Sequence, residues 1–406
     1  MAIVVQKYGG TSMGDIHRIK NVAKRVVESK RAGNKMIIVV SAMGDTTNQL
    51  VEKAFAINSN PSSREMDMLL STGEQISISL LAMAIEELGE KSISLTGAMS
   101  GIITDENHKK ARISQINPAR VFKEIKDDKI VIVAGFQGVS LEGDITTLGR
   151  GGSDTTAVAL AAATKADLCE IFTDVDGIYT SDPRIVKCAS FIPEINYDEM
   201  LELAKLGAKV LHPRAVEVAR KYNVALVVRS SFNDNPGTKV GEVGKMEKVL
   251  VRGVTVDKDI ARISVSKVPD QPGIAFGLFE QLANNNITID MIIQNLNRDK
   301  FNDISFTVAE EDLSRALEIS NEHSKKIGGE VLFKKHVSKL SIVGTGIAGS
   351  AGVASKLFGV LSSLGINIEM ISTSEIKISC IITDEMTDEA LRKVHSAFEL
   401  DKLEIK

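Results

Sequence analysis

The stretch from Gly149 to Asp167, GRGGSDTTAVALAAATKAD, combines a bare backbone, an arginine and the start of a predicted helix. Ser153 is a favoured N-cap residue, and the charge of Asp154 suits the first turn of a helix. Glycines let backbone N–H groups approach a ligand closely, and helix N-termini attract phosphate and carboxylate groups. A tight strand-to-helix turn would use the same residues. Arg150 favours the anion site, because a guanidinium group matches a carboxylate in a bidentate fork.

A second candidate anion site lies near the N-terminus, where the sequence reads KYGGTS. Lys7 ends a predicted strand just before Gly9 and Gly10. An ammonium group beside backbone N–H groups can hold a phosphoryl group, and phosphoryl transfer depends mainly on positioning and charge neutralisation. A plain strand-to-helix turn is again the alternative, but the two patterns together favour a functional site. The sequence contains neither a Walker A motif nor a GxSxG nucleophile elbow.

Both patterns belong to a region in which short apolar strands alternate with helices. The strands in KMIIVVSAMG, IVIVAGFQG and LCEIFTDVDG are rich in Ile and Val, and each segment ends at Gly. The predicted helices span 15–32, 64–89, 119–127 and 154–165. This alternation predicts an α/β domain with a mostly parallel sheet sandwiched by helices. Ligands bind beyond the carboxyl ends of such strands, which is where KYGGTS, SAMGDTT, GFQG and TDVDGIYTSDP all fall.

The C-terminal part contains an internal repeat, which follows a polar predicted linker at 230–242. PGIAFGLFEQLANNNITIDMI, from Pro272, aligns without a gap with AGVASKLFGVLSSLGINIEMI, from Ala351. Gly273 thereby pairs with Gly352. Each copy predicts the order strand, helix, strand, strand, helix, so we expect two small α+β modules. A duplication that only buries a shared sheet would show the same pattern.

One glycine pattern in the second copy is misleading. GTGIAG, residues 344–349, matches a dinucleotide-binding fingerprint and has Glu369 further along the chain. The aligned segment of the first copy, SKVPDQ, lacks these glycines. The module is also too small for a doubly wound fold, so we reject the dinucleotide interpretation.

The composition of the chain argues against several classes of protein. A length of 406 residues suggests two or three domains. A net charge of −4 and the absence of Trp argue against a nucleic-acid partner. Apolar runs such as 130–136 are too short to cross a membrane, and MAIVVQKYGG resembles a strand, not a signal peptide. Cys169, Cys188 and Cys380 show neither disulfide nor metal spacing, so we expect a cytoplasmic protein without a protein-bound metal.

Six motifs in order carry a family resemblance. KYGGTSMGD, SAMGDTTNQL, STGEQIS, TTLGRGGSDTTA, FTDVDGIYTSDPR and GAKVLHPRA resemble the aspartokinases, which have the amino acid kinase fold. The repeat resembles the ferredoxin-like ACT pair of the monofunctional aspartokinases. Together these matches cover essentially the whole chain. The resemblance implies a catalytic domain over 1–245, a strand of the second ACT module over 246–257, a first ACT domain over 258–333 and a second over 334–406.

The implied reaction converts ATP and L-aspartate to ADP and 4-phospho-L-aspartate, the first step toward lysine, threonine and methionine. The attacking β-carboxylate is already ionised at pH 7, so the reaction needs no general base. The aspartates of TDVDGIYTSDPR lack the closing Glu of an EF-hand loop, and Mg²⁺ is expected to arrive with ATP.

The resemblance also implies roles for individual residues. Lys7 and Lys209 stabilise the transferred phosphoryl group, and Asp154 holds the two lysines. Arg150 pairs with a substrate carboxylate. Glu74 accepts the substrate ammonium, although without the resemblance a solvated helix face would be favoured. The implied substrate-binding residues are Thr47, Glu74, Arg150, Gly151, Gly152 and Ser153. The implied ATP-binding residues are Lys7, Tyr8, Gly9, Gly10, Ser41, Thr173, Asp174, Tyr179, Asp182, Arg184 and Lys209.

Regulation is implied by the ACT pair, whose effector sites lie between modules of two chains in this family. L-lysine and L-threonine are the expected effectors, and a homo-oligomer through the ACT domains is the expected assembly. The matching positions are Asp270, Gln271, Gly273, Ile274, Ala275, Gln294, Asn367, Ile368 and Ser374. Met246 is a candidate internal start for a separate ACT-only chain. A sister kinase acting on glutamate, acetylglutamate or uridylate, and a catalytically silent amino-acid sensor, stay as alternatives.

Overall fold

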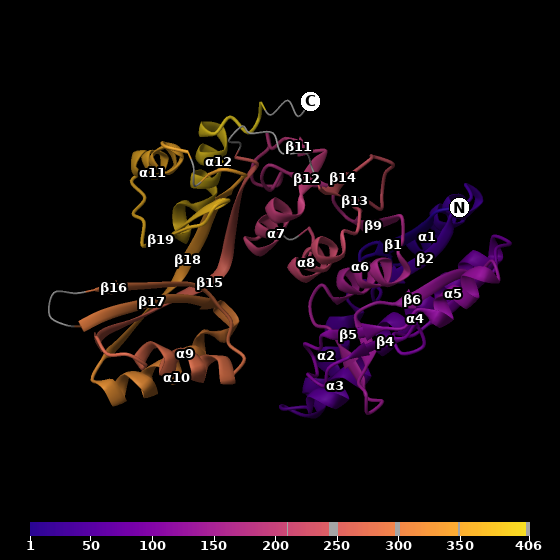
Figure 1. The fold of residues 1–406 in the computed structure, drawn as a ribbon, viewed down its shortest axis with the longest axis horizontal. Coiled ribbons are helices and arrows are strands. Elements are labelled where there is room, and N and C mark those ends of the chain that lie inside the picture. Colours follow the sequence, from indigo (N-terminus) through magenta and orange to yellow (C-terminus); the bar gives the residue numbers. More distant parts are fainter. Residues whose placement is uncertain (209, 243–250, 297–300, 348–349, 403–406) are drawn as a thin grey trace.

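The computed structural model describes residues 1–208, 210–242, 251–296, 301–347 and 350–402. Its N-terminal part is built on an eight-stranded sheet with the order β12-β14-β13-β9-β1-β2-β6-β3 (Figure 1). The strands are β1 (Ile3–Tyr8), β2 (Lys35–Val40), β3 (Ser92–Leu95), β6 (Ile130–Ala134), β9 (Leu168–Thr173), β12 (Glu194–Asn196), β13 (Leu226–Ser230) and β14 (Thr238–Gly241). Every neighbouring pair is parallel except β13 with β14, which confirms the predicted mostly parallel sheet.

Helices cover both faces of this sheet. Successive side chains of a strand point to opposite faces, so Met36 and Ile38 of β2 pack with one group of helices and Ile37 and Val39 with the other. The first group comprises α1 (Ile16–Arg31) and α4 (Thr72–Glu87). The second comprises α5 (Ala119–Lys126), α6 (Gly152–Thr164), α7 (Tyr197–Lys205) and α8 (Pro213–Tyr222). The predicted sandwich is therefore confirmed.

The predicted helix at 64–89 is two helices, α3 (Ser63–Leu70) and α4, which are separated at Ser71. The Ser71 hydroxyl donates to the carbonyl of Met68 at 2.9 Å, a local bond that competes with a continuous helix. By length and composition the stretch 63–87 would pass as a membrane span. In the fold, α4 instead buries Ile78, Leu81 and Ile85 against the sheet.

Smaller elements surround the carboxyl edge of the large sheet. A four-stranded sheet joins β4 (Ile102–Thr104), β5 (Ile113–Ile116), β7 (Gln137–Val139) and β8 (Ile145–Thr147). A hairpin joins β10 (Ile178–Tyr179) and β11 (Phe191–Ile192). Helix α2 (Thr46–Ile57) leads into α3.

The repeat forms a six-stranded sheet with the order β16-β17-β15-β18-β20-β19. Its first copy contains β15 (Gly253–Pro269), α9 (Ile274–Asn284), β16 (Ile289–Leu296), β17 (Phe301–Ala309) and α10 (Leu313–Ile327). Its second contains β18 (Glu330–Val343), α11 (Val353–Ser363), β19 (Met370–Thr373), β20 (Lys377–Thr383) and α12 (Thr387–Ala397). The element order matches the prediction. The paired Gly273 and Gly352 both act as helix N-caps, with φ of 95° and 99°.

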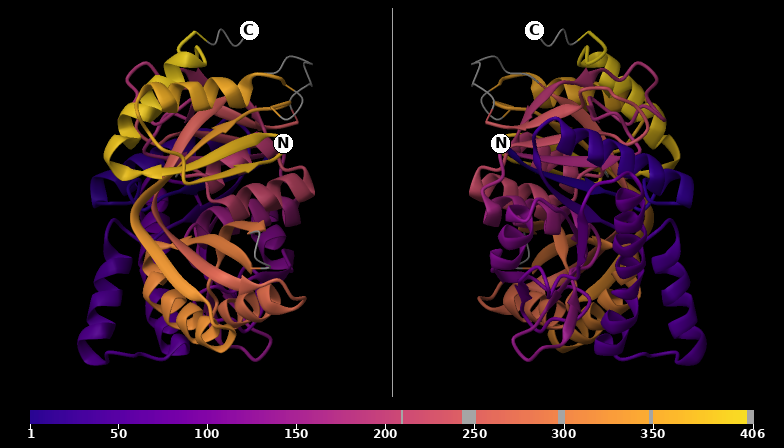
Figure 2. Two further views of the ribbon diagram at one scale, coloured as in Figure 1. Left: turned by 90° about the vertical axis from the view of Figure 1, so that its left-hand side faces the viewer. Right: turned by 90° about the vertical axis from the view of Figure 1, so that its right-hand side faces the viewer.

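Strands β15 and β18 run through both modules (Figure 2). Residues 253–257 of β15 pair with residues 339–343 of β18. The same residues of β18 also pair with β20 of the second copy. Residues 260–269 pair with β17 of the first copy. This pairing is what a strand before residue 258 that belongs to the second module would show. Residues 246–250, including Met246, lie outside the described residues, so the domain limits stay a prediction.

The N-terminal part and the second module share a hydrophobic core. Val186, from the segment after β10, is buried and packs in the cluster that holds Leu340 and Leu357. The carbonyl of Thr180 accepts from the amide of Val254 at 2.8 Å. The Thr180 hydroxyl lies 2.9 Å from Nε2 of His395. The segment that carries the predicted nucleotide residues is therefore anchored on the second module.

We expect Val186→Ala to destabilise the second module by about 1–3 kcal/mol, because it removes two buried methyl groups from a core contact. Denaturant unfolding followed by circular dichroism measures the change. Lys187→Ala, at an exposed neighbouring position, is the control and should leave the midpoint unchanged. Equal midpoints for the Val186 variant and the parent protein would contradict the shared core.

Candidate active site

The predicted motifs converge at one edge of the large sheet. Tyr8, the last residue of β1, is opposite Val40 of β2 and Phe172 of β9, and Val40 is opposite Ala134 of β6. The polar loops that follow these strands therefore begin at the same level. They also touch, because the amide of Ser41 donates to the carbonyl of Tyr8 at 3.1 Å. The expected meeting of the motifs beyond the strand ends is confirmed.

An ion pair joins the central strand to helix α6. Nζ of Lys7 lies 2.6 Å from Oδ1 of Asp154, and the two side chains are only 12% and 11% exposed. A Cβ atom placed on Gly9 would lie 3.3 Å from the same Nζ, so the ammonium group sits directly beside the bare loop. The structure thus brings together Lys7, Asp154 and the first glycine of KYGGTS.

The N-terminus of α6 differs from the prediction in one respect. The N-cap is Gly151, with φ of 66°, and Ser153 already lies inside the first turn, so the prediction of Ser153 as N-cap is wrong. Gly151 takes the cap because it adopts a left-handed conformation that other residues rarely reach. No side chain of the described residues caps this helix, which leaves first-turn N–H groups available to an anion. Ser153 packs against Gly135 instead, where a Cβ would lie 2.6 Å from its Oγ.

His212 is a neighbour of this helix start to which we assigned no role from the sequence. A Cβ atom on Gly151 would lie 2.1 Å from Cγ of His212, so this imidazole requires glycine at the cap. Nδ1 of His212 accepts from the amide of Arg214 at 3.3 Å and caps α8. Burial lowers the pKa of His212, and the nearby Asp154 partly opposes that shift. A His directly before Pro at a helix start was the available signal in GAKVLHPRA.

Glu74 lies in the first turn of α4 and is 3% exposed, so the alternative of a solvated helix face is wrong. Its Oε1 accepts from the amide of Ala42 at 3.1 Å, and its Oε2 is buried without a partner among the described residues. Burial raises the pKa of Glu74 to about 7. The preceding Gly73 packs against Ala42 and Thr46, so the first turn of α4 lies beside the start of α2, where Thr47 is half-buried.

Arg150 is a cation of the site that has no ion-pair partner among the described residues. It stands between Gly149 and Gly151, which have φ of 77° and 66°. The residue is exposed, and no ion pair with another residue in the described ranges is present. Its guanidinium group is therefore available to a ligand at the start of α6.

The predicted nucleotide residues occupy three settings. Asp182 and Arg184 form an ion pair at 2.8 Å, and hydrogen bonding from Arg184 lowers the pKa of Asp182. The Thr173 hydroxyl donates to the exposed Asp174 at 3.1 Å, and the ring of Tyr179 meets Phe191 edge to face. The Tyr8 side chain lies in the core.

The predicted ATP site also includes Gly10 and Lys209. A Cβ on Gly10 would lie 3.1 Å from the carbonyl of Ala42, so this glycine lets the first loop approach the second. Lys209 lies outside the described residues.

The predicted effector residues fall into two groups on different modules. Asp270, Gln271, Gly273, Ile274, Ala275 and Gln294 belong to the first module, and Asn367, Ile368 and Ser374 belong to the second. Gln294 lies on β16 and Ser374 follows β19, and these strands are the two outer strands of the six-stranded sheet. The first group lies at and just before the start of α9 and on β16, and the second group flanks β19.

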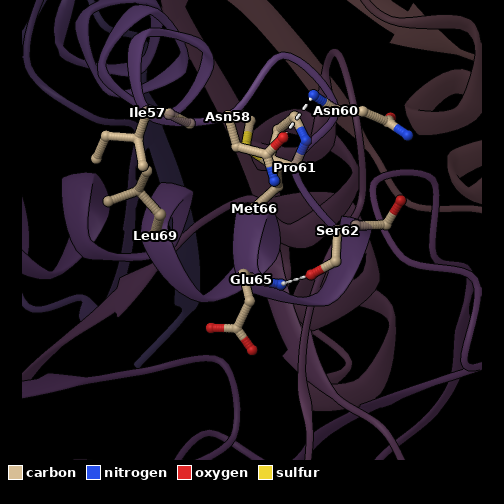
Figure 3. A pocket seen from close by; sticks show the side chains of 10 residues that line it. Ile57, Asn58, Asn60, Pro61, Ser62, Glu65, Met66 and Leu69 are labelled. Atoms are coloured by element: carbon tan, nitrogen blue, oxygen red, sulfur yellow. Dashed lines mark hydrogen bonds between the residues drawn. The ribbon is translucent and has the colours of Figure 1, made fainter.

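A hollow between α2 and α3 is separate from these residues (Figure 3). Ile57, Pro61, Met66 and Leu69 contribute to its lining. None of the predicted site residues is part of it.

Comparison with known proteins agrees with the geometry. The amino acid kinase family model matches residues 2–230, and the ACT domain model matches 263–323 and 340–398. The chain is 48% identical to an aspartate kinase of Pseudomonas fluorescens, over 99% of this chain and 98% of that protein. It is 50% identical to an aspartokinase of Geobacillus stearothermophilus, over 98% of each.

Solved structures extend the similarity to three dimensions. The E. coli aspartokinase III complex with aspartate and ADP, in the R-state, has a TM-score of 0.82 at 25% identity, and the match covers 97% of this chain and 99% of that one. The complex of the same enzyme with lysine and aspartate, in the T-state, has a TM-score of 0.73 at 26% identity, over 98% and 99%. With its catalytic motifs gathered at one sheet edge and a paired ACT module behind them, this chain belongs to the aspartokinase family.

Proposed function

We propose that this chain transfers the γ-phosphoryl group of ATP to the β-carboxylate of L-aspartate and releases ADP and 4-phospho-L-aspartate. The observation that carries the proposal is the Lys7–Asp154 pair beside the start of α6, which no side chain of the described residues caps. A carboxylate oxygen forms the new bond to phosphorus while the bond to the β–γ bridging oxygen breaks. The product feeds the synthesis of lysine, threonine and methionine. We expect the enzyme to act in the cytoplasm.

The catalytic demand of this reaction is electrostatic. The attacking carboxylate is ionised at pH 7, so no side chain has to remove a proton. Lys7 and the N–H groups of the first turn of α6 neutralise charge on the phosphoryl group as it moves. Asp154 keeps the Lys7 ammonium in place. We assign Lys209 as a second cation, and we expect Mg²⁺ to enter bound to the phosphates of ATP.

Aspartate recognition requires one anionic and one cationic partner. Glu74 offers a buried carboxylate oxygen without a partner among the described residues, which the substrate ammonium would satisfy. Arg150 offers a guanidinium group to a substrate carboxylate. We assign Thr47, Ser153 and the glycines at the start of α6 to the same subsite.

The nucleotide is assigned to the neighbouring loops. Gly9 lies beside the Lys7 ammonium group, and Gly10 and Ser41 belong to the two loops that meet there. The segment from Thr173 to Arg184 leaves the adjacent strand β9. Relatives support nucleotide use, since the E. coli enzyme was solved with ADP.

We further propose that L-lysine, together with L-threonine, inhibits the enzyme at ACT sites formed between two chains. The two groups of predicted effector residues belong to different modules. The resemblance to the aspartokinases implies that a second chain completes each site. Lysine bound to the E. coli enzyme supports the choice of effector.

A coupled assay of ADP release tests the proposed reaction. L-aspartate should support turnover, whereas L-glutamate, N-acetyl-L-glutamate and uridylate should not. Turnover with one of the other acceptors would assign a sister kinase. If none of these acceptors supports ADP release, the result would favour a non-catalytic amino-acid sensor.

We expect Lys7→Ala to lower kcat about 10²–10³-fold with a smaller change in the KM for aspartate, because one transition-state donor is lost. Steady-state kinetics measures both values. Lys24→Ala, at an exposed position on α1, is the matched control. A normal kcat for the Lys7 variant would place the phosphoryl group elsewhere.

We expect kcat/KM for aspartate to rise with pH up to about 7 and then level off. Only the ionised Glu74 carboxylate attracts the substrate ammonium, and its ionised fraction falls about tenfold per pH unit below its pKa. Glu74→Gln should raise the KM for aspartate and abolish this dependence. Glu87→Gln, at an exposed position on the same helix, should preserve it. A Glu74→Gln enzyme with the parent pH profile would exclude this role.

We expect Ser374→Phe to relieve inhibition by lysine while leaving uninhibited activity nearly intact, because a bulky ring would block a site lined by small polar groups. An effector acts only through its different affinities for two states of the enzyme. Activity is measured against lysine, with and without threonine, for this variant and for the exposed control Ser362→Phe. Unchanged inhibition would mean that the ACT pair serves assembly alone.

A further inference from the structure

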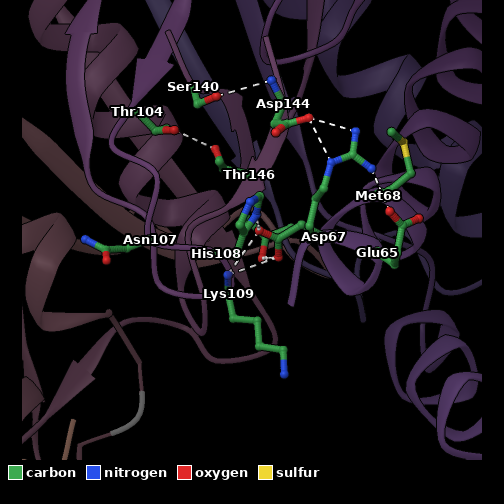
Figure 4. Close-up of polar contacts among 12 residues, drawn as sticks. Glu65, Asp67, Met68, Thr104, Asn107, His108, Lys109, Ser140, Asp144 and Thr146 are labelled. Carbon is green, nitrogen blue, oxygen red and sulfur yellow. Dashed lines mark hydrogen bonds and ion pairs between the residues drawn. The ribbon is translucent and has the colours of Figure 1, made fainter. Parts of the chain in front are cut away.

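Asp67 is a fully buried carboxylate that the proposed mechanism does not use. It lies on α3 and is 0% exposed. Its Oδ1 accepts from the hydroxyl of Thr147 at 2.5 Å, and its two oxygens receive the amide of Lys109 at 3.1 and 3.0 Å. Oδ2 also lies 2.7 Å from Nδ1 of His108 (Figure 4). A buried charge is retained only when such partners stabilise it.

All of these partners belong to two loops. One loop follows β4 and contains His108 and Lys109, and the other begins at Thr147, the last residue of β8. Lys109 adopts φ of 67°, a left-handed conformation that costs energy for a residue with a side chain. Its amide is the group that both Asp67 oxygens hold. Asp67 therefore stabilises a backbone conformation that the loop would otherwise disfavour.

The same two loops are tied together on their other side. Arg214 of α8 donates to the carbonyl of Leu148 at 2.6 Å and to that of Ala111 at 3.0 Å. The amide of Ala111 donates to the carbonyl of Thr147 at 2.9 Å. A Cβ on Gly149 would lie 2.9 Å from the carbonyl of Lys109, so the loops are in contact immediately before Arg150.

We propose that Asp67 is a positioning residue for aspartate binding. It holds the loop of His108 and Lys109 against the loop that begins at Thr147, and thereby fixes the backbone that carries Arg150. Arg150 has no protein partner of its own in the described ranges, so its orientation depends on the backbone that carries it. A guanidinium group that is already held in position loses less conformational entropy when the substrate binds. The inference rests on the proposed role of Arg150 in binding a substrate carboxylate.

Asp67→Asn tests this inference with little change in shape. The amide replaces one acceptor oxygen by a donor, so at least one of the three N–H and O–H partners loses its bond. We expect the KM for aspartate to rise about tenfold, which corresponds to the loss of one charge-assisted hydrogen bond. The KM for ATP should change less than about twofold, because the nucleotide loops leave other strands.

A double variant separates positioning from general damage. If Asp67 acts through Arg150, Asp67→Asn should add less than about twofold to the KM for aspartate in an Arg150→Ala background. Glu124→Gln is the matched control. Glu124 is also buried at 3% exposed, but its partners Arg120 and Lys129 lie on and after α5, so this variant should leave both KM values unchanged.

His108 provides a second route if Asp67→Asn does not fold. His108→Ala removes the Nδ1 donor and should raise the KM for aspartate. His108→Asn places a side-chain N–H near the same position and should restore it. Equal KM values for the alanine variant and the parent enzyme would overturn the proposal.

The remaining outcomes are also distinguishable. A normal KM for aspartate in Arg150→Ala would contradict the role of Arg150 in the proposed function. A raised KM in Arg150→Ala but a normal one in folded Asp67→Asn would overturn only the present inference. Full multiplication of the two effects in the double variant would overturn it as well, since Asp67 would then act independently of Arg150.

Discussion

The ion pair between Lys7 and Asp154 is the contact around which the catalytic half is arranged. It connects the middle of the large sheet to the start of α6, and both groups are nearly removed from solvent. Lys7 reaches α6 because it lies two residues after Val5 and therefore points to the same face of the sheet, where Val5 packs in the core. A one-residue change of register in β1 would turn the ammonium group to the face covered by α1 and α4. The site therefore depends on sheet register before it depends on any loop.

Much of this arrangement follows from local sequence. Buried parallel strands form continuous apolar runs, and the motif after each one marks the carboxyl edge, so the convergence of the loops was predictable. The repeat was equally clear, because aligned copies of one module bury the same positions, such as Leu282 and Leu361. These signals depend on periodicity and alignment within single segments.

Other features depend on contacts between distant segments. Ser153 has the right type for an N-cap, but Gly151 takes the cap where the imidazole of His212 packs. Glu74 resembles a surface residue in its helix, and only the contact with Ala42 shows that it is buried. Asp67 and His108 are separated along the chain by the end of α3, the whole of α4 and strands β3 and β4, and no motif links them. Tertiary packing decides such cases, and a local pattern does not contain it.

The sharing of strands and core between parts of the chain also has a consequence for its synthesis. The segment after β10 emerges from the ribosome early, yet Val186 is covered by residues of β18 and α11. Strand β15 likewise pairs with a strand that follows the entire first copy. Pairings between distant segments form slowly, and the surfaces that await them are prone to aggregate. The nascent catalytic half therefore exposes this apolar surface until β18 and α11 have been translated, and the risk of aggregation is concentrated in that interval.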